Sequence, residues 1–319
     1  MKIDSKINIC YLVLSQINPA MYKIHTIDLH FQSEKHSIGA FLIETKKGPI
    51  LIETGPESTW EYLEKGIQKI GYEVKDIQHV FLTHIHFDHA GAAWKFAQNG
   101  AKIYVHPIGI PHLVNPEKLW NSAKMIYTER MELLWGKMES IPEEQLIGVT
   151  EGDSVDIGDI QIKVWYTPGH AVHHNAYQID DVVFTGDVAG VKIGNGPVVP
   201  PCPPPDINIV LWKESLKKLK DLKPRALYLT HFDVQTNPEE LLSALEIVLD
   251  DWANFIKPYY DNQTPPEIIV PQFMEYTRQK FLDKRLEAEE IQTYEFANPS
   301  WMSVNGLLRY WKLKEQGRI

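Results

Sequence analysis

Residues 81–100, FLTHIHFDHAGAAWKFAQNG, place three histidines and an aspartate within six positions, at His84, His86, Asp88 and His89. A solvated loop has no need of such a cluster, and a hydrophobic core excludes polar side chains that lack partners. In an extended segment, residues two apart point to the same side, so His84 and His86 share one face. After the chain turns, Asp88 and His89 can point to a neighbouring position. Imidazole and carboxylate groups in this pattern predict ligands for borderline metal ions such as zinc or iron.

Three further polar residues each follow a predicted strand. His170 ends the segment TPGH, Asp187 ends FTGD, and His231 ends LYLTH. Polar residues directly after buried strands lie at the edge of a sheet, where the active sites of layered α/β proteins form. Together with the cluster at 84–89, they provide seven ligands from four strand ends, which is enough for two metal ions that share a bridging carboxylate.

The order of the predicted elements is that of a layered α/β protein. Alternating apolar residues predict strands within 22–55, and the segment KKG marks a hairpin there. Apolar residues at helical spacing predict a helix at 57–70. The remaining elements expected before residue 237 are strands at 79–84, 102–107, 153–170, 175–187 and 225–231 and helices at 90–98 and 208–222.

Two segments depart from this alternation. Residues 107–147 are helical by pattern, and we interpret them as an insertion that packs near the site. Its aromatic and methionine side chains either pack the insertion against the core or form an apolar wall that accepts an acyl chain. These side chains are Trp120, Met125, Tyr127, Met131, Trp135 and Met138. Residues 194–206, GNGPVVPPCPPPD, contain six prolines, and we expect this proline segment to be a stiff surface loop.

Strand signals end near residue 237. Residues 238–257, 271–290 and 300–315 are helical by pattern, which predicts a small helical C-terminal subdomain at 237–319. The main domain is expected at 22–236, because MYKIHTIDLHF has the pattern of a first strand. Residues 1–21 are then an N-terminal extension.

Composition limits the partners of this chain. A formal net charge of −10 disfavours nucleic acid and anionic membranes as partners. Two cysteines provide no disulfide framework and fit a reducing cytosol. The apolar segment at 7–14 is too short for a membrane span and lacks the features of a signal peptide. We therefore expect a cytoplasmic protein that acts on a small molecule, and the aromatic-rich insertion is compatible with a homodimer.

This order of motifs resembles the metallo-β-lactamase fold superfamily, the αββα hydrolases, over residues 22–235. The family motif His-x-His-x-Asp-His is complete here. The resemblance implies one metal at His84, His86 and His170, a second metal at Asp88, His89 and His231, and Asp187 as the bridge, with a water or hydroxide between the metals. It implies catalytic roles for Asp88 and Asp187. In LIETGP, Glu53 stands where the family has an aspartate that supports the ligands. The extra methylene of Glu53 moves the carboxylate by ~1.5 Å.

The resemblance also implies a function. Two divalent metal ions, zinc first and iron or manganese as alternatives, would activate a hydroxide and polarise the bond under attack. We expect hydrolysis of a small thioester or lactone, as in the glyoxalase-II-like or lactonase-like branch. Two alternatives stay open. One is a nuclease or phosphodiesterase, which needs a basic groove, and the other is a di-iron redox or sensing protein.

Overall fold

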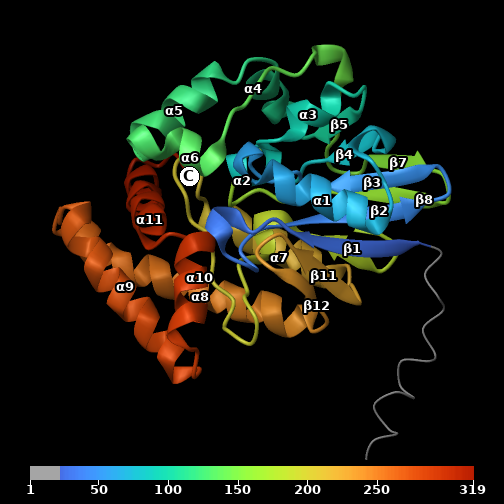
Figure 1. Cartoon of the computed structure of the whole chain (residues 1–319). Helices are drawn as coiled ribbons and strands as arrows, with labels where there is room; N and C mark the ends of the chain where they lie inside the picture. Colours follow the sequence, from blue (N-terminus) through green and yellow to red (C-terminus); the bar gives the residue numbers. More distant parts are fainter. Residues whose placement is uncertain (1–21) are drawn as a thin grey trace, which may run out of the picture.

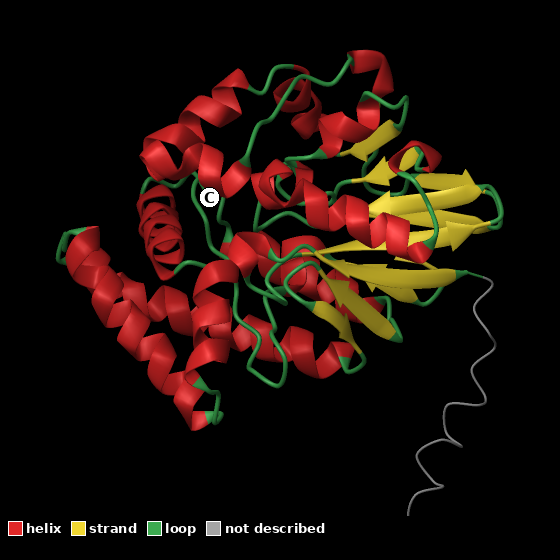
Figure 2. Cartoon of the chain, viewed as in Figure 1, coloured by secondary structure: helices red, strands yellow, loops and turns green. Residues whose placement is uncertain are grey.

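The structure is a computed structural model that describes residues 22–319, apart from the side chains of residues 125 and 126. The predicted extension at 1–21 lies outside the described residues. Two six-stranded sheets pack face to face, and helices cover the outer face of each sheet (Figures 1 and 2). This four-layer α/β arrangement with a helical C-terminal region confirms the predicted fold class.

The first sheet contains six strands in sequence order. β1 to β3 pair antiparallel, whereas β3 to β6 pair parallel. The strands are β1 Lys23–Asp28, β2 Gly39–Thr45, β3 Gly48–Ile52, β4 His79–Phe81, β5 Lys102–Val105 and β6 Leu146–Gly148.

The second sheet has the order β12-β11-β10-β9-β8-β7. β10 and β11 pair parallel, and the other neighbours pair antiparallel. β12 follows the predicted last strand and was not expected from the sequence. The strands are β7 Ser154–Ile157, β8 Ile160–Tyr166, β9 Asn175–Ile179, β10 Val182–Phe184, β11 Ala226–Leu229 and β12 Asp233–Gln235.

Strand alternation builds three hydrophobic clusters. In β2, Phe41 and Ile43 point to the second sheet, while Ala40 and Leu42 point to the helices that cover the first sheet. The same period-two pattern sends Phe184 between the sheets and Val183 toward the helices that cover the second sheet. Both faces of each sheet are therefore buried, as layered α/β proteins require.

The helices over the first sheet include the predicted insertion. The helical pattern of the insertion is divided into separate helices, and one break falls at Thr128, which adopts a positive φ of 51° after Tyr127. A residue whose backbone has a positive φ cannot continue a right-handed helix. The helices are α1 Trp60–Ile70, α2 Phe87–Ala90, α3 Ala93–Ala97, α4 Ile110–Val114, α5 Glu117–Tyr127 and α6 Met131–Trp135.

The helices over the second sheet include the C-terminal region. Its predicted second helix at 271–290 is divided at Arg285, which has a φ of 63°, and Glu287 then starts a new helix with a capping box. The sequence pattern missed this break because the charged residues there favour helix. The helices are α7 Ile209–Asp221, α8 Pro238–Asp261, α9 Pro266–Asp283, α10 Ala288–Ala297 and α11 Ser300–Glu315.

The C-terminal helices share one hydrophobic cluster with the second sheet and α7. A separate subdomain at 237–319 therefore stays a prediction. The expectation that the proline segment forms a surface loop is wrong for its central part, because residues 198–203 are buried. The C-terminal helices cover it. Among residues 22–319, none of the helices combines the length and apolar character needed to cross a membrane.

Candidate metal centre

All seven predicted ligands meet at one edge of the two sheets. His84 and His86 follow β4, and Asp88 and His89 lie in α2, directly after them. His170 follows β8, His231 follows β11, and Asp187 lies in a short 3-10 helix after β10. The chain ends of β4, β10 and β11 meet here because the sheets pack face to face, and Asn175 N donates to Thr83 O at 2.8 Å across them.

His84, His86 and His170 form the first set of candidate ligands. His86 Nδ1 lies 2.9 Å from His84 Nε2 and 3.1 Å from His170 Nε2. His84 and His170 are 0% and 1% exposed. Three ring nitrogens thus converge on one point, within 4.8 Å of one another.

Asp88, His89 and His231 form the second set of candidate ligands. Asp88 Oδ2 lies 3.7 Å from His89 Nε2 and 3.4 Å from His231 Nε2. Asp187 faces both sets, because its Oδ1 lies 3.2 Å from His89 Nε2 and 3.4 Å from His231 Nε2. Its Oδ2 lies 3.3 Å from His170 Nε2. The two oxygens of one buried carboxylate are therefore divided between the two sets.

Three of these histidines form hydrogen bonds through Nδ1 with groups outside the centre. The Nδ1–H of His170 donates to Pro201 O at 2.9 Å, and that of His231 donates to Ser37 O at 2.6 Å. His84 Nδ1 lies 3.0 Å from Thr83 Oγ1. These bonds select one tautomer of each ring and direct the Nε2 lone pair toward the centre.

The donor set fits a cation. In the described part of the chain, His89 Nε2, Asp187 Oδ1 and His231 Nε2 are buried and have no hydrogen-bond partner, although they lie close together. Buried polar atoms without partners are costly and rare. Once these nitrogens have lost their protons, lone pairs from carboxylate and imidazole groups face one another and gain a partner when a divalent ion lies between them.

Glu53 contacts the second set directly, through His89, and the first set indirectly, through Thr83 and His84. Its Oε1 accepts from His89 Nδ1 at 3.1 Å and from Thr83 Oγ1, and its Oε2 accepts from Thr83 N at 3.3 Å. Glu53 is fully buried and has a positive φ of 65°. Such a conformation persists only when surrounding contacts hold it. The residue that departs from the family aspartate therefore contacts a ligand directly.

His174 holds the backbone of Asp187. Asp187 N donates to His174 Nε2 at 3.2 Å, so the proton of the ring is on Nδ1, which lies 2.8 Å from Thr167 Oγ1. A side chain at Gly186 would lie 2.4 Å from Thr83 Oγ1 and 2.9 Å from His174 Nε2, so glycine keeps this turn close to β4.

Burial and charge set the protonation of the centre. Burial, with His170 nearby, lowers the pKa of His86 to about 3, and burial lowers that of His84 well below its ordinary value. Burial alone would raise the pKa of Asp187, but His89 and His170 hold it well below its ordinary value. Burial opposes the charge of His89, yet Asp187 and Asp88 raise its pKa well above the ordinary value. The first set thus presents neutral imidazoles, whereas the second set holds a proton that a cation would displace.

Aromatic side chains of the insertion contact Phe87, the residue directly before Asp88. Phe87, beside Asp88, lies 5.9 Å from the rings of Trp120 and Trp135. Tyr127 contacts Trp135 at 5.2 Å and Trp301 of α11 at 5.7 Å, and its hydroxyl lies 3.2 Å from Met302 Sδ. The insertion therefore packs near the site, where α5, α6 and α11 lie side by side (Figure 1).

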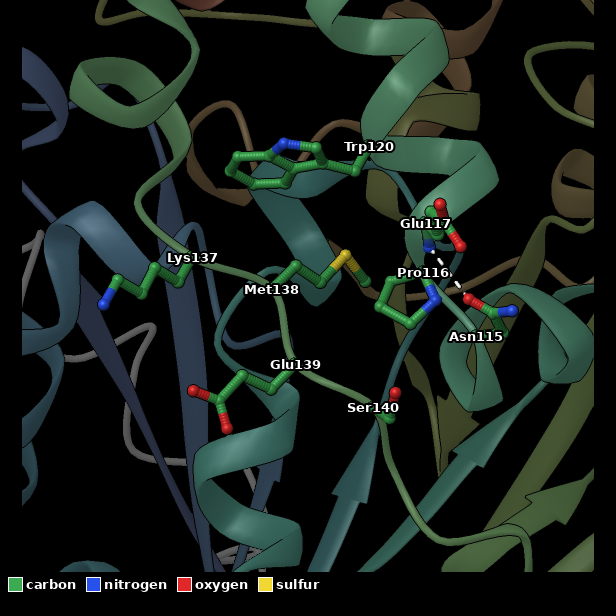
Figure 3. A pocket seen from close by; sticks show the side chains of 8 residues that line it. All are labelled: Asn115, Pro116, Glu117, Trp120, Lys137, Met138, Glu139 and Ser140. Atoms are coloured by element: carbon green, nitrogen blue, oxygen red, sulfur yellow. Dashed lines mark hydrogen bonds between the residues drawn. The ribbon is translucent and has the colours of Figure 1, made fainter.

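Of the two roles expected for the insertion, packing against the core is confirmed. Met131 and Trp135 are buried in the cluster that covers the first sheet, which is a packing role. The side chain of Met125 is not among those that the structure describes. A cavity of about 650 Å³ is lined by residues that include Trp120 and Met138, and Figure 3 shows these side chains. None of its lining residues is among the seven predicted ligands, so an acyl-binding wall over the metals stays a prediction.

Sequence reasoning missed three supporting groups: the hydroxyl of Thr83 and the carbonyls of Ser37 and Pro201. Thr83 offered one signal, since it directly precedes His84. The two carbonyls offered none, because every residue has one. Their positions depend on packing between segments that are far apart in the chain.

Comparisons with known proteins agree with this geometry. A family model described as the metallo-beta-lactamase superfamily matches residues 37–231. The chain is 33% identical over 159 residues to ST1585, a metallo-beta-lactamase fold-containing protein of Sulfurisphaera tokodaii, across 49% of this chain and 60% of that protein. This match thus spans less than two thirds of the relative. An N-acyl homoserine lactonase of Bacillus thuringiensis is 25% identical over 211 residues, across 57% of this chain and 73% of the lactonase.

Solved structures show the same fold. The crystal structure of ST1585 superposes with a TM-score of 0.58 at 26% identity, covering 70% of this chain and 85% of that one. The metallo-beta-lactamase family protein TTHA1429 of Thermus thermophilus reaches a TM-score of 0.62 at 17% identity, covering 93% of this chain and 94% of that one, which shows the fold alone. The matching family model spans more than half of the chain and includes all seven predicted ligands, so the chain belongs to the metallo-beta-lactamase superfamily.

Proposed function

We propose that this protein is a dinuclear metal-dependent hydrolase that cleaves an ester-like bond, a lactone or a thioester, in a small molecule. Membership of the superfamily supports a hydrolase in general. The observation that carries the dinuclear proposal is the Asp187 carboxylate, whose Oδ1 faces His89 and His231 while its Oδ2 faces His170. A carboxylate divided in this way is suited to bridge two adjacent cations.

The ligand chemistry favours zinc, with iron or manganese as alternatives, because imidazole and carboxylate groups bind all three. When bound, two such ions supply a Lewis acid and a hydroxide nucleophile at neutral pH. The residues of the chain would hold the ions and orient the attacking water. Asp88, whose side chain is 21% exposed, is the carboxylate at the solvent side of the second set, where it can accept a hydrogen bond from the attacking water.

Two observations support a small lactone or thioester as the substrate. The Bacillus thuringiensis relative is named as a lactonase, and its match covers most of its length. The aromatic side chains of the insertion, which contact Phe87 beside Asp88, suit the apolar part of an acyl compound. A net charge of −10 disfavours the polyanionic substrate of a nuclease.

The test combines elemental analysis of the purified protein with turnover of four substrates: an acyl homoserine lactone, an acyl-glutathione, bis-p-nitrophenyl phosphate and a β-lactam. His231→Ala is compared with His25→Ala, which removes a half-buried histidine that bonds Glu44 outside the centre. We expect two metals per chain, turnover of the lactone or thioester, and loss of both properties only in His231→Ala. Turnover of the phosphodiester alone would favour a nuclease, and less than one metal with no turnover would contradict the proposal.

A further inference from the structure

The proline segment at 194–206 connects the C-terminal helices to the metal centre. Pro201 O accepts the Nδ1–H of His170 at 2.9 Å, which fixes the ring of a predicted ligand. Pro201 and its neighbour Cys202 are buried. Val199 pairs with Val191, but the prolines that follow have no N–H to donate, so groups outside the segment must hold the backbone around Pro201 in place.

Side chains of α10 and α11 and the turn between them hold it. Tyr294 Oη donates to Pro197 O at 2.7 Å, and Asn298 Nδ2 donates to Pro200 O at 3.1 Å. Ser303 Oγ accepts from Cys202 N at 3.4 Å and donates to Asn298 Oδ1 at 3.0 Å. Three residues of the C-terminal region thus bond the backbone on both sides of Pro201.

Gly306 adds close packing to these bonds. A Cβ at this position would lie 1.9 Å from Cys202 O and 2.9 Å from Cys202 C. The backbone of α11 therefore lies directly against the residue that follows Pro201. Because backbone atoms cannot move aside as a flexible side chain can, any side chain at 306 must displace the proline segment or the helix.

We propose that the C-terminal helices are a positioning element for the first ligand set, with Asn298, Ser303 and Gly306 as positioning residues. They act through the proline segment, whose Pro201 carbonyl sets the tautomer and orientation of His170. The inference rests on the proposed function in one respect, which is that His170 binds a metal ion. Groups that orient a ligating histidine in this way affect metal affinity strongly.

The test compares Gly306→Ala and Ser303→Ala with Thr277→Val. Thr277 is a buried residue of α9 whose hydroxyl bonds only within its helix, to Phe273 O and Met274 O. Zinc affinity is measured by competition with a chelator, and His170→Ala identifies the binding step that belongs to the first set. We expect Gly306→Ala and Ser303→Ala to weaken that step about tenfold or more, with the other step and Thr277→Val unchanged.

A second readout needs no metal. In the metal-free protein, the Nδ1–H of His170 is protected by its bond to Pro201 O, so NMR should detect a slowly exchanging imidazole N–H that His170→Ala removes. We expect this signal to shift or disappear in Gly306→Ala and Ser303→Ala. If Gly306→Ala fails to fold, Ser303→Ala decides. Folded variants with wild-type zinc affinity and an unchanged signal would overturn the inference, whereas a wild-type protein without metal or turnover would overturn the proposed function.

Discussion

Replacing the buried carboxylate of Glu53 by an amide tests how the ligands are supported. Oε1 of Glu53 accepts two bonds, from His89 Nδ1 and Thr83 Oγ1, and Oε2 accepts one from Thr83 N. In Glu53→Gln, either orientation of the amide places its NH₂ against at least one of these donors. The variant therefore loses at least one hydrogen bond and the negative charge behind His89.

The expected size of this effect follows from these contacts. A hydrogen bond to a charged group contributes about 1.5–3 kcal/mol, which corresponds to about tenfold to a hundredfold in affinity. Losing the charge also lowers the pKa of His89, so protons compete less with the metal. A divalent ion interacts with the carboxylate about twice as strongly as a proton does. Metal affinity of the second set should therefore fall, by about tenfold to a hundredfold.

The assay is chelator competition with zinc at one fixed pH, together with thermal unfolding of the metal-free protein. Glu44→Gln is the matched control. Glu44 is a partly exposed residue of β2 that bonds His25 at 2.7 Å, and it is separated from every candidate ligand by many residues of sequence. Glu53→Gln with both zinc affinities within about twofold of the wild type would refute a role for this carboxylate in supporting His89.

Three further outcomes are expected. Asp187→Ala should lose both metals on elemental analysis and lower hydrolysis about 10³-fold, since metal assistance provides several kcal/mol; retention of two metals with full turnover would exclude the bridge. Because His89 in the metal-free protein holds a proton below its raised pKa, zinc binding should release that proton, and affinity should rise about tenfold per pH unit below this pKa. Calorimetry in two buffers of different ionisation enthalpy measures the release, and equal heats would contradict it. Phe184→Ala should lower the free energy of unfolding by about 3–5 kcal/mol, measured in denaturant, because Phe184 is fully buried between the sheets; a loss below about 1 kcal/mol would argue against that packing.

The sequence alone predicted the layered fold and pointed to the candidate ligands. His84, His86, Asp88 and His89 lie close together in the chain, so their chemistry and spacing can be read directly. Apolar strands before Asp187 and His231 indicate the sheet edge where ligands gather. These features depend only on residues that are close together in the chain, so a single sequence is enough to recognise them.

Helix boundaries and the proline segment show the limit of local patterns. Thr128 and Arg285 break helices through left-handed backbone conformations, although neither residue type indicates one. The proline segment is irregular by composition, yet its centre is buried, with side chains of the C-terminal region bonded to its backbone. Burial depends on which distant elements cover a segment, and no local pattern contains that information.

The tertiary structure decided how the ligands are held. It placed Glu53 against His89, Pro201 O against His170, and Ser37 O against His231. It also divided the two oxygens of Asp187 between the ligand sets. The residue types that can bind a metal are few and visible in the sequence. The carbonyls and supporting groups that orient them are common to every residue, so only the packing of segments far apart in the chain selects which ones act.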